Sequence, residues 1–217
     1  LTRSGIACTL IEEKRIMHGV SGRTTAKITS QHGLIYDRLL RDLGPERARM
    51  YWQANEDALA FFRNQAQAAE WDFLPQNNYI YATSGNERLE NEMAAYEKLQ
   101  IPARWETNLP LPFPISGALC FTNQAQFHPL KFAANISAAL RIYENTKAIS
   151  LSNNQVRTPK GTITAKKVII ATHFPMLNKH GAYFLKLYQQ RSYVIALENA
   201  GKVDGMYLDC AENGLSV

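Results

Sequence analysis

The feature that most constrains this chain is a short apolar run that ends in an acidic residue. Residues 6–11 read Ile-Ala-Cys-Thr-Leu-Ile, and Glu12 follows at once. The run is typical of a strand, and Gly5 in front of it is suited to close a preceding helix. A carboxylate at the carboxyl end of a strand can accept both hydroxyl hydrogens of a ribose, as in dinucleotide-binding folds. Taken alone, the pattern is also typical of an ordinary surface acid.

A loop of small and hydroxyl-bearing residues follows this acid. Residues 19–25 read Gly-Val-Ser-Gly-Arg-Thr-Thr. Consecutive small residues expose backbone N–H groups, and the hydroxyls and Arg23 add donors for a diphosphate. A flexible loop with a helix cap is the alternative, but the loop and Glu12 together favour a cofactor site.

The chain begins too close to Glu12 to contain the glycine-rich part of a dinucleotide-binding fingerprint. Its glycine-rich part should lie about 20 residues before the acidic residue, and only eleven residues precede Glu12. No initiator Met opens the chain, and no polar tail closes it. We therefore expect an internal fragment, cut at both ends, with a glycine-rich strand–turn–helix upstream.

Helical periodicity is clear in four places. Apolar residues at helical spacing predict two packed helices within 34–70, separated at Gly44-Pro45. A further helix is predicted over 86–99, and Pro129 is well placed to begin one that runs to about residue 140. The run 109–114 contains three prolines, each of which removes a backbone donor, so it predicts an extended connection.

Strands are predicted mainly in the second half of the chain. Short apolar or β-branched runs indicate them, and Lys160-Gly161 predicts a turn. The predicted strands cover 79–82, 141–143, 146–151, 155–158, 162–165, 167–171, 191–197 and 206–209. The Val-Ile-Ile content of 167–171 predicts a buried strand.

Composition narrows the functional classes. The chain is 46% hydrophobic and 20% charged, which is typical of a folded protein. No apolar run approaches the roughly 20 residues that a membrane span needs. The 24 basic and 19 acidic residues are scattered, so no nucleic-acid partner is expected. Three cysteines without C-x-x-C spacing and five histidines without ligand spacing favour a reducing cytoplasm and no metal centre.

Several segments resemble, in order and spacing, the D-amino-acid-oxidase-like superfamily of FAD-dependent oxidoreductases, which includes glycine and sarcosine oxidases. They are 10–12 (Leu-Ile-Glu), 19–23 (Gly-Val-Ser-Gly-Arg) and 167–172 (Lys-Val-Ile-Ile-Ala-Thr). A narrower resemblance is to the bacterial branch whose full-length members carry a carboxyl-terminal Rieske iron–sulfur domain. It is carried by 22–33, 124–129 and 171–175.

The resemblance implies FAD as cofactor and oxidation of a C–N bond of an amine or amino acid by hydride transfer to flavin. A Rieske cluster is implied only if the parent protein has that domain, since no Cys-x-His pair occurs in these residues. The implied partner is the small-molecule substrate, and a homo-oligomer is compatible with the sequence. The alternative is a cofactor-free fragment that acts as a binding module or is inactive alone, because without the glycine-rich loop the diphosphate loses its main cradle.

The resemblance also implies which residues hold the cofactor. Glu12 would bind the adenosine ribose, and Ala148 would offer its backbone to adenine. The residues that would run along the diphosphate towards the isoalloxazine are Ser21, Gly22, Arg23, Thr24 and Thr25. Ala171 and Thr172 stand where relatives have Ala-Thr-Gly beside the cofactor, with His173 in place of the glycine.

No catalytic residue is assigned, and two candidates remain open. An ammonium at Lys27 near the flavin would stabilise a reduced, anionic ring, while a salt-bridged or solvent-facing lysine is the alternative. His32 is either a proton shuttle or a hydrogen-bonded residue in a tight turn before Gly33. His128, in front of Pro129, is interpreted as a capping residue.

The expected fold class is mixed α/β, with a partial FAD-binding, Rossmann-like domain and an antiparallel-sheet substrate domain. Residues 1–70, without the glycine-rich unit, and 129–178 would form the flavin-binding domain. Residues 71–128 and 179–217 would form part of the substrate domain.

Overall fold

A computed structural model describes residues 1–67, 69–176, 181–199, 201, 203–212 and 214–217. The chain divides into two compact units. Unit 1 consists of Leu1–Ile16 and Leu140–Gly201, and unit 2 of Met17–Ala139 and Lys202–Val217. Parallel and antiparallel sheets occur together with helices, which confirms the expected mixed α/β class. None of the described helices is both long enough and apolar enough to cross a membrane.

Unit 2 is built on a sheet with the strand order β10–β3–β5–β2, in which β4 also pairs with β5. The strands are β2 (Lys27–Ile28), β3 (Leu74–Ala82), β4 (Arg104–Glu106), β5 (Gly117–Gln126) and β10 (Met206–Asp209). All pairs are antiparallel except that of β10 with β3. The sequence predicted β10 and the end of β3, whereas β2, β4 and β5 were missed. The first five residues of β5 are all buried, so the strand lacks the alternation that marks a half-exposed one.

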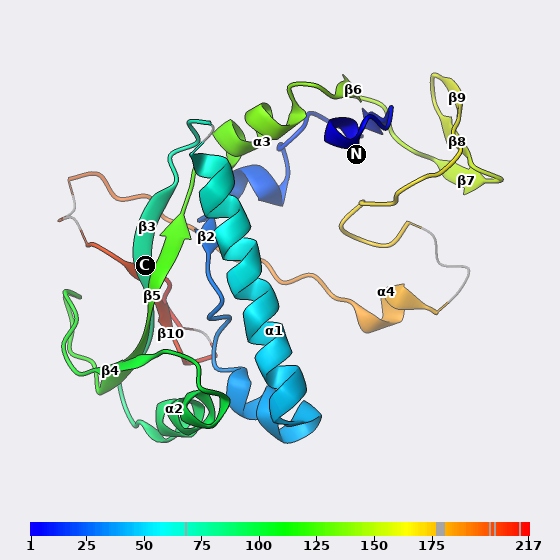
Figure 1. Ribbon diagram of the computed structural model, residues 1–217. Coiled ribbons are helices and arrows are strands. Elements are labelled where there is room, and N and C mark those ends of the chain that lie inside the picture. Colours follow the sequence, from blue (N-terminus) through cyan, green and yellow to red (C-terminus); the bar gives the residue numbers. More distant parts are fainter. Residues whose placement is uncertain (68, 177–180, 200, 202, 213) are drawn as a thin grey trace. The chain divides into compact units, whose positions relative to one another are not determined.

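Two helices cover one face of this sheet (Figure 1). They are α1 (Tyr36–Ala66) and α2 (Glu87–Leu99). Gly44 has φ 79° and interrupts α1 just before Pro45, which confirms the two predicted helices and their break. The helix α3 (Pro129–Ser137) begins at the predicted proline, after the short 3₁₀ helix η2 (Val20–Arg23) and the strands β2 to β5.

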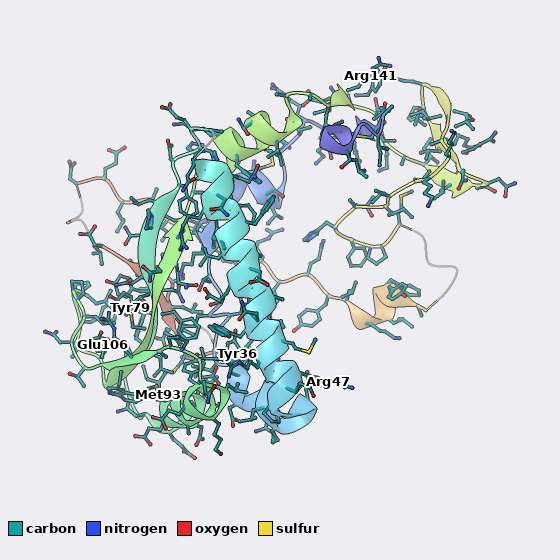
Figure 2. The ribbon with its side chains drawn as sticks, in the orientation of Figure 1. Tyr36, Arg47, Tyr79, Met93, Glu106 and Arg141 are labelled. Carbon is teal, nitrogen blue, oxygen red and sulfur yellow. The ribbon has the colours of Figure 1, made fainter. Side chains whose placement is uncertain are left out.

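The core of unit 2 lies between these helices and the sheet. Ile80, Leu119 and Phe121 of the sheet pack there with Tyr36 and Tyr96 of the helices. On the opposite face, the rings of Tyr79 and Tyr207 stack with centroids 4.9 Å apart, and Leu109, Leu111 and Phe113 of the predicted extended connection pack beside them. Figure 2 shows Tyr36 and Tyr79 on these two sides.

Unit 1 consists of short strands. In it β1 (Thr9–Ile11) pairs in parallel with β6 (Arg141–Tyr143). A second, antiparallel sheet contains β7 (Ser150–Ser152), β8 (Gln155–Thr158) and β9 (Gly161–Thr164). The short helices are η1 (Thr2–Ser4), which Gly5 closes at φ 72° as predicted, and α4 (Tyr183–Lys186).

Two predicted strands of unit 1 were wrong. Residues 167–171 and 191–197 have no strand structure, and Ile169 and Ile195 are 75% and 83% exposed. Likewise 146–149 is irregular, and β7 begins only at Ser150. Val and Ile raise the propensity for a strand, but a strand also needs a hydrogen-bonded neighbour. None of the described strands pairs with 167–171 or 191–197.

Candidate functional site

Glu12 lies directly after β1, at the carboxyl end of a parallel strand, as the sequence predicted. Its backbone continues the pairing with β6, because its N–H donates to the Tyr143 carbonyl at 3.0 Å. One carboxylate oxygen accepts the backbone N–H of Lys14 at 2.9 Å. The other oxygen has no hydrogen-bond partner among the described residues, so it is available to a ligand hydroxyl.

Unit 1 also brings the segment of Ala148 to Glu12. The Glu12 carbonyl accepts the N–H of Thr146 at 2.7 Å, two residues before Ala148. Thr146 is buried, and its hydroxyl donates to the Glu144 carbonyl at 3.0 Å, which fixes the turn. Glu12 and Ala148, both predicted to hold the adenosine half of a cofactor, therefore lie in two segments that a backbone hydrogen bond joins.

The predicted cofactor residues Ala171 and Thr172 lie in an exposed, irregular stretch of unit 1. The Thr172 hydroxyl donates to the Phe174 carbonyl at 2.8 Å. His173 has φ 63°, the left-handed conformation that glycine adopts without strain. Histidine is among the residues that tolerate this conformation, so it keeps a backbone shape suited to glycine at this position.

Gly22, at the centre of the small-residue loop in unit 2, cannot carry a side chain. A Cβ atom there would lie 2.1 Å from the Met17 carbonyl oxygen and 3.3 Å from a methyl carbon of Leu130. The neighbouring Thr24 hydroxyl accepts the Ala26 N–H at 3.1 Å, in a turn where Ala26 has φ 53°. The absence of a side chain at this point of the loop thus has a local steric cause.

This loop borders a cavity of about 630 Å³ that lies wholly within unit 2. Thr24 and Thr25 line it together with the end of β5 and the start of α3. The full lining is Gly22, Thr24, Thr25, Asp72, Phe73, Leu74, Gln126, Phe127, His128, Pro129 and Leu130. Ser21 and Arg23 are exposed residues of η2 and do not line the cavity.

His128 combines the predicted capping role with a place in the cavity wall. Its imidazole Nδ1 accepts the Lys131 N–H at 3.4 Å, which confirms its interpretation as a capping residue. Beside it, Asp72 is ion-paired with Lys131 at 2.8 Å and has φ 54°. No local pattern indicates the cavity role of His128 or Asp72, because the tertiary pairing of β3 with β5 brings 72–74 and 126–130 together.

The side chain of Lys27 is partly buried and hydrogen-bonded to two neutral groups. Its ammonium donates to the Tyr207 carbonyl at 3.2 Å and to the Ser216 hydroxyl at 3.0 Å. No carboxylate among the described residues pairs with it. Burial lowers the pKa of Lys27, because the charged form loses solvation that these two neutral acceptors only partly replace.

His32 lies in a turn before Gly33, which has φ 69°. Its Nδ1 and the Tyr51 hydroxyl are joined by a hydrogen bond of 2.9 Å. Burial lowers the pKa of His32, and a hydrogen bond to the Thr29 carbonyl acts in the opposite direction. The hydrogen-bonded turn therefore describes this residue, and the lowered pKa favours its neutral imidazole.

Metal ligands do not gather in the described part of the chain. No group of three or more His, Cys, Asp or Glu residues there has a metal-binding arrangement. Unit 1 presents a carboxylate, which can accept hydrogen bonds from a ribose, and the loop of unit 2 presents hydroxyls, backbone N–H groups and an arginine, which can donate to a diphosphate. At Gly22 the backbone passes so close to the Met17 carbonyl that only a glycine fits. The residues present are thus compatible with a dinucleotide.

The sequence profile of the family described as "DAO: FAD dependent oxidoreductase" matches residues 1–214. The chain is 33% identical to the "Putative Rieske 2Fe-2S iron-sulfur protein YhfW" of Bacillus subtilis (strain 168), over 96% of the chain and 44% of that protein. It is 24% identical to the gamma-glutamylputrescine oxidoreductase of Escherichia coli (strain K12), over 79% of the chain and 44% of that protein.

Among solved structures, the fold is similar to that of the glycine oxidase from Geobacillus kaustophilus. The TM-score is 0.53 at 20% sequence identity, over 75% of the chain and 48% of the oxidase. The chain thus spans less than half the length of each of these three proteins.

Proposed function

Since this chain belongs to the DAO family of FAD-dependent oxidoreductases, we propose that the whole protein oxidises a C–N bond of an amine or amino acid and that this chain supplies part of its flavin site. A relative that acts on an amine, the gamma-glutamylputrescine oxidoreductase, supports this substrate class. FAD, when bound, supplies the redox step by accepting hydride from the carbon next to the amine nitrogen. The chain's own residues bind and orient.

The observation that carries the proposal is the position of Glu12, directly after a parallel strand and with one carboxylate oxygen to which no described residue donates. Glu12 would accept the ribose hydroxyl hydrogens, and the backbone of Ala148 would contact adenine. The residues that would hold the diphosphate and lead to the ring are Ser21, Gly22, Arg23, Thr24 and Thr25. Ala171 and Thr172 would lie beside the cofactor.

Two residues of unit 2 would act near the redox centre. The Lys27 ammonium, which has no carboxylate partner among the described residues, would provide positive charge for an anionic reduced ring. His32 would act as a proton shuttle, with a pKa below that of a free imidazole because of burial. No protein base is required if the substrate amine arrives deprotonated.

The proposal extends to domain organisation and electron transfer. Residues 1–70 and 129–178 would belong to the flavin-binding domain, and 71–128 and 179–217 to the substrate domain. The similarity to a protein named for a Rieske 2Fe-2S centre supports an iron–sulfur acceptor as an alternative to oxygen. That acceptor would lie in a part of the whole protein that this chain does not include.

The first test is uptake of FAD by the purified chain, followed by visible absorbance and flavin fluorescence. Glu12→Ala should weaken binding about 10- to 100-fold, because a charged hydrogen bond contributes about 1.5–3 kcal/mol. Glu13→Ala is the matched control, since the exposed Glu13 is occupied by an ion pair with Lys147 at 2.9 Å. Equal losses in both variants would show that Glu12 has no special role.

A second pair of variants tests the loop. Gly22→Ala should weaken binding because its Cβ would collide with the Met17 carbonyl. Gly19→Ala lies in the same loop with open space around the added atom and should bind as the wild type does.

One observation favours the alternative of a cofactor-free module. Unit 1, which carries Glu12 and Ala148, leaves many large apolar side chains exposed, among them Ile169 and Ile195. A colourless chain that takes up no added FAD, yet is otherwise folded, would support that alternative.

A further inference from the structure

The segment from Thr24 to Ser30 is held along its length by the end of β5. Lys27 and Ile28 pair with Gln126 and Ala125. On one side of this short ladder, the Phe127 N–H donates to the Ala26 carbonyl at 3.3 Å. On the other side, the Gln124 side-chain oxygen accepts the Ser30 N–H at 2.7 Å. Successive residues of β5 therefore follow the segment from Ser30 back towards Thr25.

The register of this pairing decides where along β5 the cavity residues Thr24 and Thr25 lie. A slip by one residue would turn the side chains of Lys27 and Ile28 to the other face and would move Thr24 and Thr25, which precede them, by one residue along β5. Because β2 has only two residues, its own ladder fixes the register weakly. Gln124 adds a fixed point beyond the ladder, since a slip would leave this buried amide without its partner.

Gln124 points inward because β5 contains a bulge. Between Gln76 and Asn78 of β3 lies one residue, whereas two residues, Thr122 and Asn123, lie between their partners on β5. In a regular strand, residues 122 and 124 would share a face, but Thr122 is exposed and Gln124 is 2% exposed. The extra residue thus reverses the alternation and aims Gln124 at the segment.

The backbone conformation of Asn123 and two hydrogen bonds to neighbouring carbonyls stabilise the bulge. Asn123 has φ 58°, a left-handed conformation that asparagine tolerates and β-branched residues do not. Arg63 of α1 donates to the Asn123 carbonyl at 2.7 Å, and the Gln124 amide donates to the Thr122 carbonyl at 3.0 Å. From α1 also comes Glu56, whose carboxylate accepts the Ser30 hydroxyl.

We propose that the bulge at Asn123 and the Gln124–Ser30 hydrogen bond form a positioning device, which sets the register in which Thr24 and Thr25 face the cavity. The consequence for FAD rests on the proposed function. The register itself does not, and it can be measured on the chain without a cofactor.

The test compares two substitutions at one exposed position. Asn123→Val disfavours the left-handed conformation, whereas Asn123→Gly preserves it. Hydrogen exchange should show protection of the Ser30 amide falling about tenfold in Asn123→Val relative to amides in the middle of β3, and unchanged in Asn123→Gly. Gln124→Leu should give the same local loss. Unchanged protection of the Ser30 amide in Asn123→Val, or an equal loss of protection throughout unit 2, would overturn the proposal.

FAD affinity is measured on the same three variants. Binding should weaken about tenfold in Asn123→Val and Gln124→Leu and stay as in the wild type in Asn123→Gly. If the wild-type chain binds no FAD, the proposed function fails for this chain, while hydrogen exchange still decides the register. If FAD binds all variants equally although Ser30 loses protection, the device does not position the cofactor site.

Discussion

Unit 1 and unit 2 differ sharply in how much apolar surface they bury. Unit 2 contains large buried side chains on both faces of its sheet, such as Tyr36, Leu119 and Tyr207. Among the residues that the structure describes, Val156 is the single buried hydrophobic residue of unit 1. Unit 1 nevertheless contains many apolar residues. Those that are exposed include Ile6, Leu10, Tyr143, Ile149, Ile169, Ile170, Tyr183, Phe184, Leu185, Tyr188, Tyr193, Val194, Ile195 and Leu197.

The difference shows that apolar content alone does not produce a core. The long strands β3 and β5 of unit 2 present a continuous surface for α1 and α2 to cover. In unit 1, β1 and β6 form a parallel pair of three residues each, and a parallel sheet is normally stable only when both of its faces are covered. We therefore expect the stability of this chain to reside in unit 2.

Truncation of one core side chain in each unit should give the largest contrast. Leu119→Ala should lower the free energy of unfolding by about 2–5 kcal/mol, the usual cost of a large cavity in a packed core. Val156→Ala, in the thin sheet of unit 1, should cost about 1 kcal/mol or less, because neighbours are few. Urea unfolding followed by tryptophan fluorescence measures the first change, since Trp52, Trp71 and Trp105 all lie in unit 2.

Hydrogen exchange of the amides of β8 measures the second change. Similar losses in both units would mean that unit 1 is as cooperative as unit 2, and the contrast between them would disappear.

The same contrast separates what the sequence could predict from what it could not. The helices were predicted because their signals are local: apolar spacing, the break at Gly44 and the proline at the start of α3. The strand predicted over 167–171 was wrong because the apolar content of a segment does not show whether another strand lies beside it. β5 was missed because a strand buried on both faces that also contains a bulge has no regular alternation.

The candidate site also has features that local sequence predicts and features that depend on tertiary pairing. Glu12 after its strand and the loop of small residues around Gly22 could be predicted, since each shows in consecutive residues of the sequence. The cavity could not be predicted, because Phe73 and Phe127 reach it only through the pairing of β3 with β5. Whether the predicted residues hold FAD stays a prediction.

The next largest effect is expected at Glu92, which belongs to α2 but caps α1. Its two carboxylate oxygens accept the N–H groups of Tyr36 and Asp37 at 2.8 and 2.9 Å, where Ile35 offers no side-chain cap. Glu92→Ala should cost about 1–3 kcal/mol, because buried donors lose their acceptor. Glu92→Gln retains one acceptor and should cost less. Equal costs would show that packing, not capping, is the contribution.

Glu92 also predicts a pH dependence with a definite sign. Burial raises its pKa above the ordinary value of 4.5, against the opposing effect of the two N–H groups. The folded state then holds this proton more tightly than the unfolded state does, so the free energy of unfolding should fall as the pH rises from 4.5 through the raised pKa. Glu92→Gln should remove this fall in urea unfolding measured across that range.

A smaller effect of the opposite sign is expected at Lys27. Burial lowers its pKa below 10.5, so the unfolded state binds this proton more tightly, and stability should rise with pH between the lowered pKa and 10.5. Lys27→Met should remove the rise and cost less than about 1 kcal/mol near neutral pH, because a buried ammonium without a carboxylate contributes little net stability. Urea unfolding of both proteins across the alkaline range measures the difference. A Lys27→Met chain that keeps the rise would assign it to another group.

The smallest effect on stability is expected from the exposed apolar side chains of unit 1. Ile169→Thr should change the free energy of unfolding by less than about 0.5 kcal/mol, since the side chain makes few contacts to lose. The same substitution at Ile80, which is fully buried in unit 2, should be severely destabilising because it places a hydroxyl in the core. Binding of a hydrophobic dye and the concentration at which the chain self-associates should respond to Ile169→Thr although stability does not. If Ile169→Thr unfolds unit 1, this side chain is packed in solution, and the poor core of unit 1 is not the reason for the contrast between the units.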